Sequence, residues 1–260
     1  ELTVHHRLES IQYLKKNKPH LIFGVLGCMA QNLKNDLLES KPYVDVILGP
    51  DSYRRIPEII NSRKLNLGHQ VDTRLSKFEV YEDLFPLRQN GVNAWVSISR
   101  GCDNFCTFCI VPFTRGRERS RSKKSIIDEI YEAVAKGFIE VTLLGQNVNS
   151  YRTEDGTFAD LLQSVAEIDG LRRIRFMSPH PKDFDEKLFE VIASYDNICN
   201  YLHIPLQSGS DRILKRMNRN YTQSEFINLI NMAKKIIPNC SISTDIIVGF
   251  PGETENEFEE

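Results

Sequence analysis

The second half of the chain alternates short apolar runs with amphipathic segments, and this alternation limits the possible folds more than any other feature. Five apolar runs predict strands at residues 95–99, 140–144, 173–176, 201–205 and 241–248. Repeated strand–helix units of this length predict a parallel sheet with right-handed crossovers, either open or barrel-like. In such folds the reactive groups lie at the carboxyl ends of the strands.

Helix boundaries in this region follow from capping residues and from glycine or proline stops. Thr157 and Thr222 each precede an acidic residue three positions later, which is the pattern of a capping box. Gly137 and Pro238 mark the ends of two helices. Together these signals predict four helices, over residues 126–136, 158–168, 185–193 and 226–237.

The first 65 residues predict a smaller unit of the same α/β class. Strands are expected at residues 21–26 and 44–48, with helices over residues 8–14, 32–40 and 53–62. We interpret this part as the remnant of a doubly wound α/β domain.

The sequence therefore predicts two domains and a connection. Residues 1–65 form the first domain, residues 66–90 lack periodicity and form a linker, and residues 91–260 form a partial parallel (β/α) barrel. The chain starts without a methionine and stops just after the capping pattern Thr254-x-x-Glu257. We therefore expect a fragment lacking both termini, which ends before the last strand–helix unit of the barrel.

The overall composition limits the class of protein. The chain has 260 residues, of which 41% are hydrophobic, so it can bury a substantial core. A net charge of −2 alone predicts no polyanionic partner, and neither a membrane-spanning run nor a signal peptide is visible. Six cysteines are too few for a disulfide scaffold of this length, so their clustering favours metal binding in a reducing cytoplasm.

Three of the cysteines follow the first strand of the series directly. Cys102, Cys106 and Cys109 have the spacing Cys-x3-Cys-x2-Cys, with no fourth cysteine nearby. Three thiolates can hold three irons of a [4Fe–4S] cluster and leave the fourth iron open to a small molecule. Structural zinc is the alternative, but it usually has four ligands in two pairs. Phe105 and Phe108 flank the cysteines and would shield a cluster from water, or they could be ordinary packing residues.

This triplet, with an aromatic residue before its last cysteine, resembles the signature of the radical S-adenosylmethionine (radical SAM) enzymes. The resemblance implies that S-adenosylmethionine binds the open iron of a cluster held by the three catalytic cysteines. It further implies that the reduced cluster passes one electron to the sulfonium, so that a 5′-deoxyadenosyl radical forms. An electron donor such as flavodoxin or ferredoxin would supply the reductant.

Longer stretches narrow the resemblance to the methylthiotransferases. The run from Gly101 to Arg121 is similar to that family, as are residues 143–150, 178–181, 203–210 and 248–254. Gln-Asn-Val-Asn, within residues 143–150, is the best marker of the branch that modifies N6-isopentenyladenosine of tRNA. The resemblance implies insertion of a methylthio group at C2 of that adenine, beside the anticodon. It also makes the first predicted domain the C-terminal part of an N-terminal methylthiotransferase domain.

In this family a second [4Fe–4S] cluster, held by three N-terminal cysteines, is the sulfur donor. Cys28 resembles the last of those cysteines, and the other two would precede Glu1. Taken alone, Cys28 could equally be a small buried thiol at a strand end. Cys199 and Cys240 match no motif, and we expect them to be core thiols.

Polar residues lie at the ends of several predicted strands. Capping of loops is an alternative for each one alone, but their joint placement at one edge of the sheet favours contact with S-adenosylmethionine. His180 and His203 lie at similar heights and are predicted to be polar core residues without a catalytic role. The predicted cofactor-binding residues are Phe108, Gln146, Ser178, Gln207 and Asp245.

A basic stretch follows the cysteines. Between Arg100 and Lys124 there are seven basic residues against two acidic ones, in a chain that is negative overall. Such a run is usually only a solvated surface. Because it adjoins the predicted active site, we expect it to bind phosphates of a tRNA anticodon loop, whose single-stranded bases can be splayed out. The residues predicted to bind RNA are Arg115, Arg117, Arg119 and Arg121.

Two other functions remain open at this point. A sister methylthiotransferase would act on a ribosomal protein or on threonylcarbamoyladenosine in tRNA. A metal-stapled RNA-binding module would carry the same cysteines without catalysis. In each case we expect a cytoplasmic monomer without a membrane partner.

Overall fold

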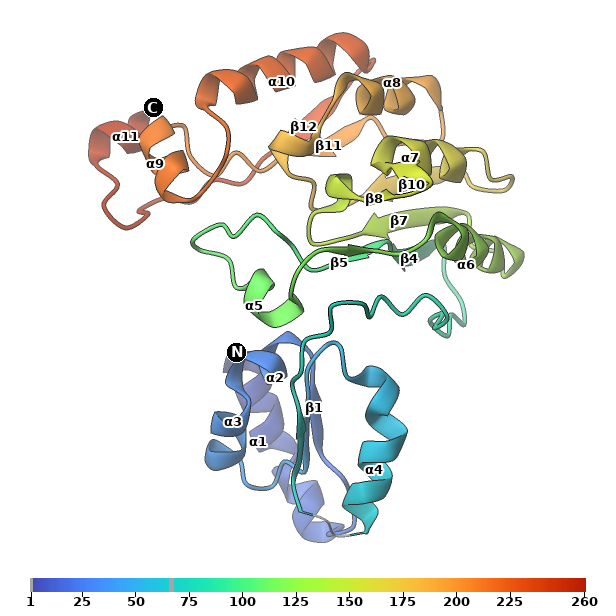
Figure 1. Cartoon of the computed structure of the whole chain (residues 1–260), viewed down its shortest axis with the longest axis vertical. Coiled ribbons are helices and arrows are strands. Elements are labelled where there is room, and N and C mark those ends of the chain that lie inside the picture. Colours follow the sequence, from blue (N-terminus) through green and yellow to red (C-terminus); the bar gives the residue numbers. More distant parts are fainter. Residues whose placement is uncertain (1, 66–67) are drawn as a thin grey trace. The chain divides into compact units, whose positions relative to one another are not determined.

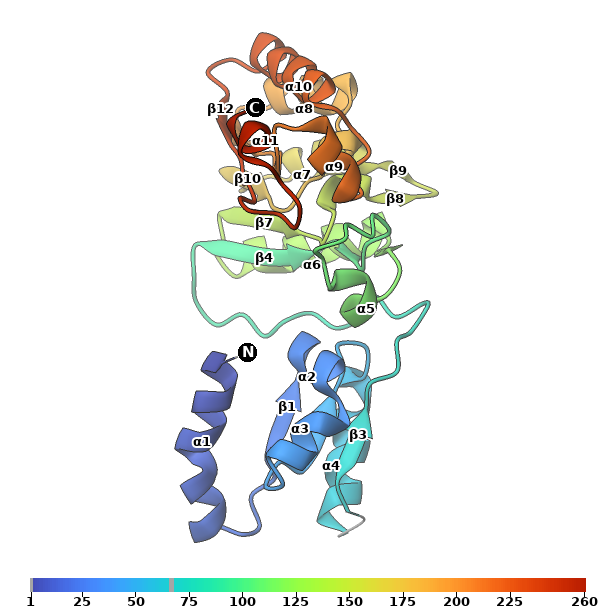
Figure 2. The ribbon, with the colours of Figure 1, turned by 90° about the vertical axis from the view of Figure 1, so that its left-hand side faces the viewer.

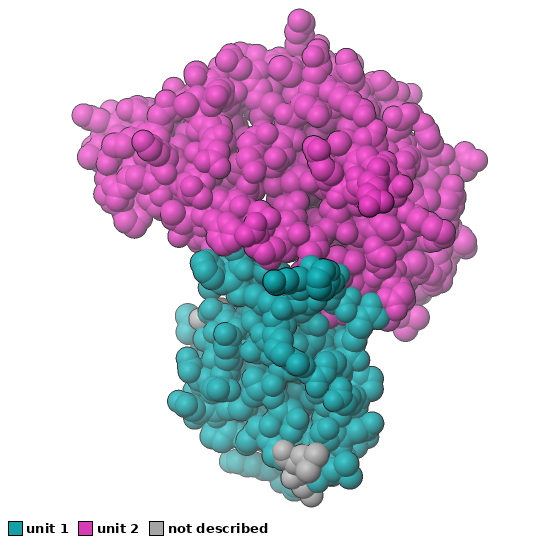
Figure 3. All heavy atoms as spheres, viewed as in Figure 1, with its two compact units in different colours: residues 1–79, 110–116 teal, residues 80–109, 117–260 magenta. Residues whose placement is uncertain are grey.

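The computed structural model describes residues 2–65 and 68–260, and these residues form two compact units. Residues 1–79 with 110–116 belong to unit 1, and residues 80–109 with 117–260 belong to unit 2 (Figure 3). Residue 1 and two positions of the predicted linker, 66 and 67, lie outside the described residues.

Unit 1 is a three-stranded parallel sheet with helices on both faces (Figures 1 and 2). Its strands pair in the order β1 (Gly24–Leu26), β2 (Val46–Leu48) and β3 (Gln70–Asp72). The helices are α1 (Leu2–Asn17), α2 (Cys28–Leu33), α3 (Asn35–Ser40), α4 (Ile56–Lys64), which follows the 3-10 turn η1 (Tyr53–Arg55), and α5 (Val111–Arg115).

Alternating side chains of β2 separate the two faces of this sheet. Ile47 packs in a cluster with residues of α1, α2 and α3, including Leu8 and Leu37. Val46 and Leu48 point the other way and pack against Ile59 of α4. Burying one side chain on each face in turn is what a doubly wound arrangement requires, so the predicted α/β class is confirmed for this unit.

Unit 2 is built from parallel strands in an open arc. Strands β4 (Asn93–Ser97), β7 (Glu140–Leu144) and β10 (Arg173–Phe176) pair in parallel, with β7 in the middle. Strand β11 (Tyr201–His203) pairs in parallel with β12 (Ser241–Ser243), and a single parallel bridge joins Ile174 to Ile198. The described strands do not close into a barrel, in keeping with the predicted partial barrel.

Four helices lie along one side of the arc (Figure 1). They bury a common apolar core against the strands, in which Val96, Leu143 and Ile174 are fully enclosed. Along β4, Val96 and Ala94 face this core, whereas Trp95 lies on the opposite, exposed face. The helices are α6 (Lys123–Ala135), α7 (Phe158–Ala166), α8 (Glu186–Ser194) and α10 (Gln223–Ile236).

The capping signals fix these helices largely as predicted. Thr157 and Thr222 form capping boxes with Asp160 and Glu225. Helix α6 begins three residues earlier than expected, because the side chain of Ser122 accepts a hydrogen bond from the backbone of Ser125. The hydroxyl that caps the helix is therefore one turn before the predicted one.

Short elements complete unit 2. Two antiparallel pairs join β5 (Ser99–Arg100) to β6 (Arg119–Ser120) and β8 (Arg152–Thr153) to β9 (Gly156–Thr157). Among the described helices, none has the length and apolar character needed to cross a lipid bilayer. The remaining elements are η2 (Val148–Ser150), η3 (Pro181–Asp183), α9 (Asp211–Arg216) and α11 (Glu255–Glu259).

Candidate functional site

The three clustered cysteines lie in a loop that follows β4 and β5. The loop begins at Gly101, whose φ of 78° lies in the left-handed region that favours glycine. The backbone amide of Gly101 donates to the side-chain oxygen of Gln146 at 2.7 Å, which fixes the loop to the end of β7. The amide of Cys109 donates to the carbonyl of Cys106 at 2.9 Å. Cys102 and Cys106 are buried, and Cys109 is half-buried.

These thiols line a cavity of about 220 Å³ at the carboxyl ends of the strands of unit 2. The predicted cofactor-binding residues line the same cavity, although they come from segments far apart in the sequence. The structure thus brings together every residue predicted for the cluster and for S-adenosylmethionine within this unit. The eight residues are Cys102, Cys106, Phe108, Cys109, Gln146, Ser178, Gln207 and Asp245.

Several residues at this cavity adopt strained backbone conformations. Ser178 and Gln207 line it with φ values of 61° and 74°, and Phe105 in the cysteine loop has a φ of 48°. Non-glycine residues in this region cost on the order of 1 kcal/mol or more each, and they cluster at functional sites. The strain is consistent with a site whose backbone is shaped for a ligand rather than for stability.

The cavity also contains residues that the sequence analysis did not assign to it. Asn104, Pro179, Pro205 and Arg219 also line it, together with His180 and His203. Arg219 is buried, and its guanidinium nitrogen lies 3.4 Å from the sulfur of Cys106. No motif in the sequence distinguishes this arginine from the many surface arginines, so only the folded structure reveals its position.

The two histidines predicted to be core residues both reach the cavity. His180 is buried, and its Nδ1 accepts a hydrogen bond from the backbone amide of Lys182 at 3.3 Å. Burial, followed by the charges of Arg219 and Lys182, lowers the pKa of His180 to about 3. His180 is therefore neutral at physiological pH.

His203 belongs to a chain of hydrogen bonds between β11 and β12. Its Nδ1 lies 2.8 Å from the hydroxyl of Ser243, which also lies 2.6 Å from the hydroxyl of Tyr201. Its Nε2 lies 3.1 Å from a carboxylate oxygen of Asp245. These hydrogen bonds extend from the strands to the cavity, where the side chain of Asp245 is exposed.

The donor set at the cavity fits an iron–sulfur cluster. Burial, more than the negative charges of Glu118 and the neighbouring cysteines, raises the pKa of the Cys102 thiol. A raised pKa favours the protonated thiol. Bound iron would reverse this preference, because a coordinating thiol is deprotonated outright. Among the described residues, no three histidine, cysteine or acidic side chains surround a point where one metal ion could bind. Three thiols around a cavity suit the corners of a larger cluster better than one tetrahedral ion.

The four arginines predicted to bind RNA occupy different environments. Arg117 is exposed and forms an ion pair with Asp103 at 2.7 Å. Arg119 is buried, and so is Arg121, whose guanidinium forms an ion pair with Glu129 at 2.6 Å. Burial thus gives Arg121 a structural role, and an RNA could reach only Arg117 of these three without a rearrangement.

Arg115 lies in unit 1 beside Cys28. Its Nε donates to the Cys28 sulfur at 2.8 Å, and helices α5 and α2 carry the two residues. Cys28 is half-buried at the first residue of α2, and only Gly27 separates it from β1. The site is a thiol at a strand end with a cationic hydrogen-bond donor beside it.

The two remaining cysteines differ from the prediction in degree. Cys199 and Cys240 are only partly buried, and Cys240 packs against the core of unit 2. Burial raises the pKa of the Cys240 thiol. Both lie just before a strand, Cys199 before β11 and Cys240 before β12, where neighbouring side chains cover them incompletely.

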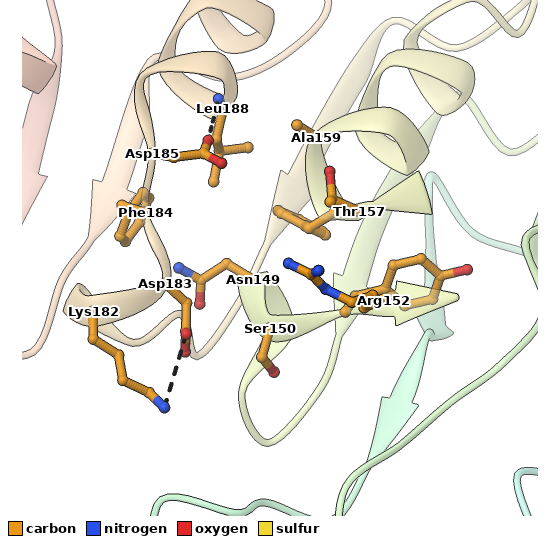
Figure 4. A pocket seen from close by; sticks show the side chains of 12 residues that line it. Asn149, Ser150, Arg152, Thr157, Ala159, Lys182, Asp183, Phe184, Asp185 and Leu188 are labelled. Atoms are coloured by element: carbon orange, nitrogen blue, oxygen red, sulfur yellow. Dashed lines mark hydrogen bonds and ion pairs between the residues drawn. The ribbon is translucent and has the colours of Figure 1, made fainter. Parts of the chain in front are cut away.

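A larger cavity of about 340 Å³ lies between η2 and the first residues of α7 and α8 (Figure 4). Its walls carry Asp183 and Asp185, and the carboxylate of Asp185 already caps α8 through the amide of Leu188. No described cysteine lines it. The smaller cysteine-lined cavity is therefore the better candidate for a catalytic site.

Comparison with known proteins places the chain among radical SAM enzymes. The Radical SAM superfamily matches residues 96–260. The tRNA-2-methylthio-N(6)-dimethylallyladenosine synthases of Christiangramia forsetii and Bacteroides thetaiotaomicron are 48% and 49% identical, each over 100% of this chain and 58% of the relative. The synthase of Clostridium botulinum is 46% identical over 100% of this chain and 59% of its own length. The chain thus spans less than two thirds of these relatives, whose names confirm the predicted resemblance.

Solved structures show the same fold at low sequence identity. The radical S-adenosylmethionine methyltransferase TsrM from Kitasatospora setae, with tryptophan and a SAM analogue bound, has a TM-score of 0.71 at 16% identity. The match covers 98% of this chain and 54% of TsrM. The cobalamin-dependent radical enzyme OxsB has a TM-score of 0.66 at 14% identity, over 94% of this chain and 39% of OxsB. From the match to residues 96–260, this chain belongs to the radical SAM superfamily.

Proposed function

We propose that this chain is the catalytic part of a tRNA methylthiotransferase that modifies C2 of N6-isopentenyladenosine beside the anticodon. The observation that carries the proposal is the convergence of three thiols and the predicted polar residues on one cavity. Similarity at 46–49% identity to synthases of that modification supports the choice of substrate. A sister methylthiotransferase would share the cavity, so the choice of substrate depends on the names of these relatives.

The residues of the cavity have distinct proposed roles. Cys102, Cys106 and Cys109 would hold a [4Fe–4S] cluster, which with S-adenosylmethionine supplies reductive cleavage and removal of a hydrogen atom from the base. Phe108 would exclude water from the site. Gln146, Ser178, Gln207 and Asp245 would orient the amino acid, ribose and adenine parts of the cofactor, because they surround the same space as the thiols.

The proposal also includes parts outside this cavity. Cys28 would be one ligand of a second cluster that donates sulfur, with Arg115 as a donor to its thiolate. Arg117 would contact a phosphate of the anticodon loop. Residues 1–65 would belong to the N-terminal methylthiotransferase domain and residues 91–260 to the radical SAM core. We further propose a monomer in the cytoplasm that takes electrons from a flavodoxin- or ferredoxin-type donor.

Nucleoside analysis of tRNA from cells lacking the gene tests the substrate. We expect 2-methylthio-N6-isopentenyladenosine to disappear and N6-isopentenyladenosine to accumulate. The wild-type gene should restore the modification, and the gene carrying Cys109→Ala should not. Loss of a methylthiolated ribosomal protein or threonylcarbamoyladenosine instead, with this nucleoside unchanged, would assign the chain to a sister enzyme.

Product analysis in vitro separates the enzyme from a metal-stapled RNA-binding module. After anaerobic reconstitution with iron and sulfide, the chain is incubated with S-adenosylmethionine and a strong reductant. The enzyme should release 5′-deoxyadenosine, and the Cys109→Ala variant should release none. An RNA-binding module would produce none in either case.

A further inference from the structure

The segment after α9 folds back onto the cysteine loop. The backbone amide of Thr107 donates to the carbonyl of Met217 at 3.1 Å, and the Thr107 hydroxyl donates to the carbonyl of Arg216 at 3.1 Å. The side-chain amide of Asn218 donates to the carbonyls of Asn104 and Phe105, at 2.9 and 3.1 Å. Residues more than a hundred positions away in the sequence thus hold the backbone on both sides of Cys106.

Arg219 follows Asn218 and places a buried positive charge beside Cys106. Its guanidinium donates to the Cys106 sulfur at 3.4 Å, to the carbonyl of Pro205 at 3.0 Å and to the hydroxyl of Tyr221 at 2.9 Å. Tyr221 is itself fixed by a hydrogen bond to the carbonyl of Leu206 at 2.7 Å. The guanidinium therefore cannot turn away from the sulfur without breaking several contacts.

The charge of Arg219 has no carboxylate partner among the described residues. The residue is 7% exposed, and all its protein partners apart from the thiol are neutral. A buried cation without a counter-charge is costly, and natural proteins retain one mainly where an anion binds. One of its partners, the Cys106 sulfur, is a thiolate when it binds iron.

We propose that Arg219 is a positioning residue that donates to the Cys106 thiolate and raises the reduction potential of the cluster. A hydrogen bond and a positive charge at a ligand sulfur stabilise the reduced cluster, which carries one more negative charge than the oxidised cluster. Asn218 holds the loop that presents Cys106. This inference rests on the proposed function only in that Cys102, Cys106 and Cys109 carry the cluster.

The test is a redox titration of the reconstituted chain without S-adenosylmethionine, followed by electron paramagnetic resonance. Arg219→Gln should lower the ratio of reduced to oxidised cluster at a fixed potential about tenfold, a shift of about −59 mV for one electron. Arg219→Lys should shift the potential less, because it keeps the charge. Arg216→Gln is the matched control, since Arg216 lies in the same segment with its guanidinium toward Gly252.

The outcomes separate this inference from the proposed function. If the wild-type chain assembles no cluster, the proposed function fails. If the Arg219→Gln variant assembles a cluster whose reduction potential is unchanged, the inference is overturned. If, in addition, that variant binds S-adenosylmethionine more weakly, Arg219 serves that cofactor instead.

A second measurement covers the case in which Arg219→Gln does not fold. In the chain without iron, Asn218→Ala should speed hydrogen exchange of the Thr107 amide at least about tenfold, because the loop loses two hydrogen bonds. The exposed Asn220→Ala is the control and should leave that exchange unchanged. If the Thr107 amide exchanges equally fast in both variants, the segment after α9 does not hold the loop.

Discussion

The side-chain oxygen of Gln146 accepts a hydrogen bond from the backbone amide of Gly101, 2.7 Å away. This contact joins the end of β7 to the residue directly before Cys102. Gly101 is buried, so its amide has no water to replace the lost partner. Gln146 therefore supports the cysteine loop in addition to lining the cavity, and the two roles predict different consequences of its loss.

Gln146→Leu should destabilise the chain even without a cluster. The substitution keeps the approximate size of the side chain but leaves the buried Gly101 amide unpaired, which costs about 1–3 kcal/mol. Chemical denaturation of the iron-free chain measures the change. Gln163→Leu on the exposed face of α7 is the control and should change stability by less than about 0.5 kcal/mol. An equal effect of both substitutions would show that the contact with Gly101 contributes nothing.

The buried ion pair between Arg121 and Glu129 predicts a larger loss. Both side chains are nearly inaccessible, and Arg88 also pairs with Glu129. Glu129→Gln leaves two cations in the interior without their carboxylate, and breaking such a pair costs about 3–5 kcal/mol. The exposed pair of Lys124 and Asp128 on the same helix supplies the control. Asp128→Asn should cost less than about 1 kcal/mol in the same denaturation experiment.

His180 predicts how stability depends on pH. Its pKa in the folded chain is about 3, well below its ordinary value of 6.5, because burial and then the charge of Arg219 disfavour the protonated ring. Between these values the unfolded chain binds the extra proton, so stability falls as pH falls from 6.5 towards 3. The slope from this residue is at most about 1.4 kcal/mol per pH unit.

His180→Asn isolates this contribution. Asparagine can still accept the hydrogen bond that Nδ1 of His180 accepts from Lys182, but it does not titrate. Denaturation at several pH values should show a smaller slope for the variant than for the wild type between pH 6.5 and pH 3. The exposed His6→Asn is the matched control. Parallel curves for wild type and His180→Asn would contradict the assignment.

The sequence predicts most of the sheet but not all of it. Long apolar runs and capping boxes locate β7, α7 and α10, because periodicity over many residues outweighs local noise. Strand β3 is missed and lies within the predicted linker, since Val71 is its only apolar residue and a three-residue strand has no period. Pairing with β2, a tertiary contact, is what makes this segment a strand.

At the site, too, local patterns can be predicted from the sequence and long-range contacts cannot. The cysteine motif and strand-end residues are found by spacing and position, but Asn218 and Arg219 act through a long-range contact that no local pattern encodes. The environments of the four predicted arginines also depend on the fold rather than on their spacing. Helix α5 ends at Arg115, and Gly116 follows with a φ of 74°. Arg117 is exposed, whereas Arg121 is buried in the core.

The exposure of Arg117 predicts a salt-dependent contribution to RNA binding. Its side chain is 70% exposed beside the cysteine loop, and its ion pair with Asp103 can exchange for a phosphate. Arg117→Gln should weaken binding of an anticodon stem-loop that contains N6-isopentenyladenosine, and should reduce the salt slope by about 1. Arg173→Gln is the control, because Arg173 is also exposed and paired but lies at the amino end of β10, away from the cavity. If both variants bind like the wild type at every salt concentration, Arg117 makes no phosphate contact. If both weaken equally, the effect comes from net charge, because a contact at the mouth of the site would distinguish them.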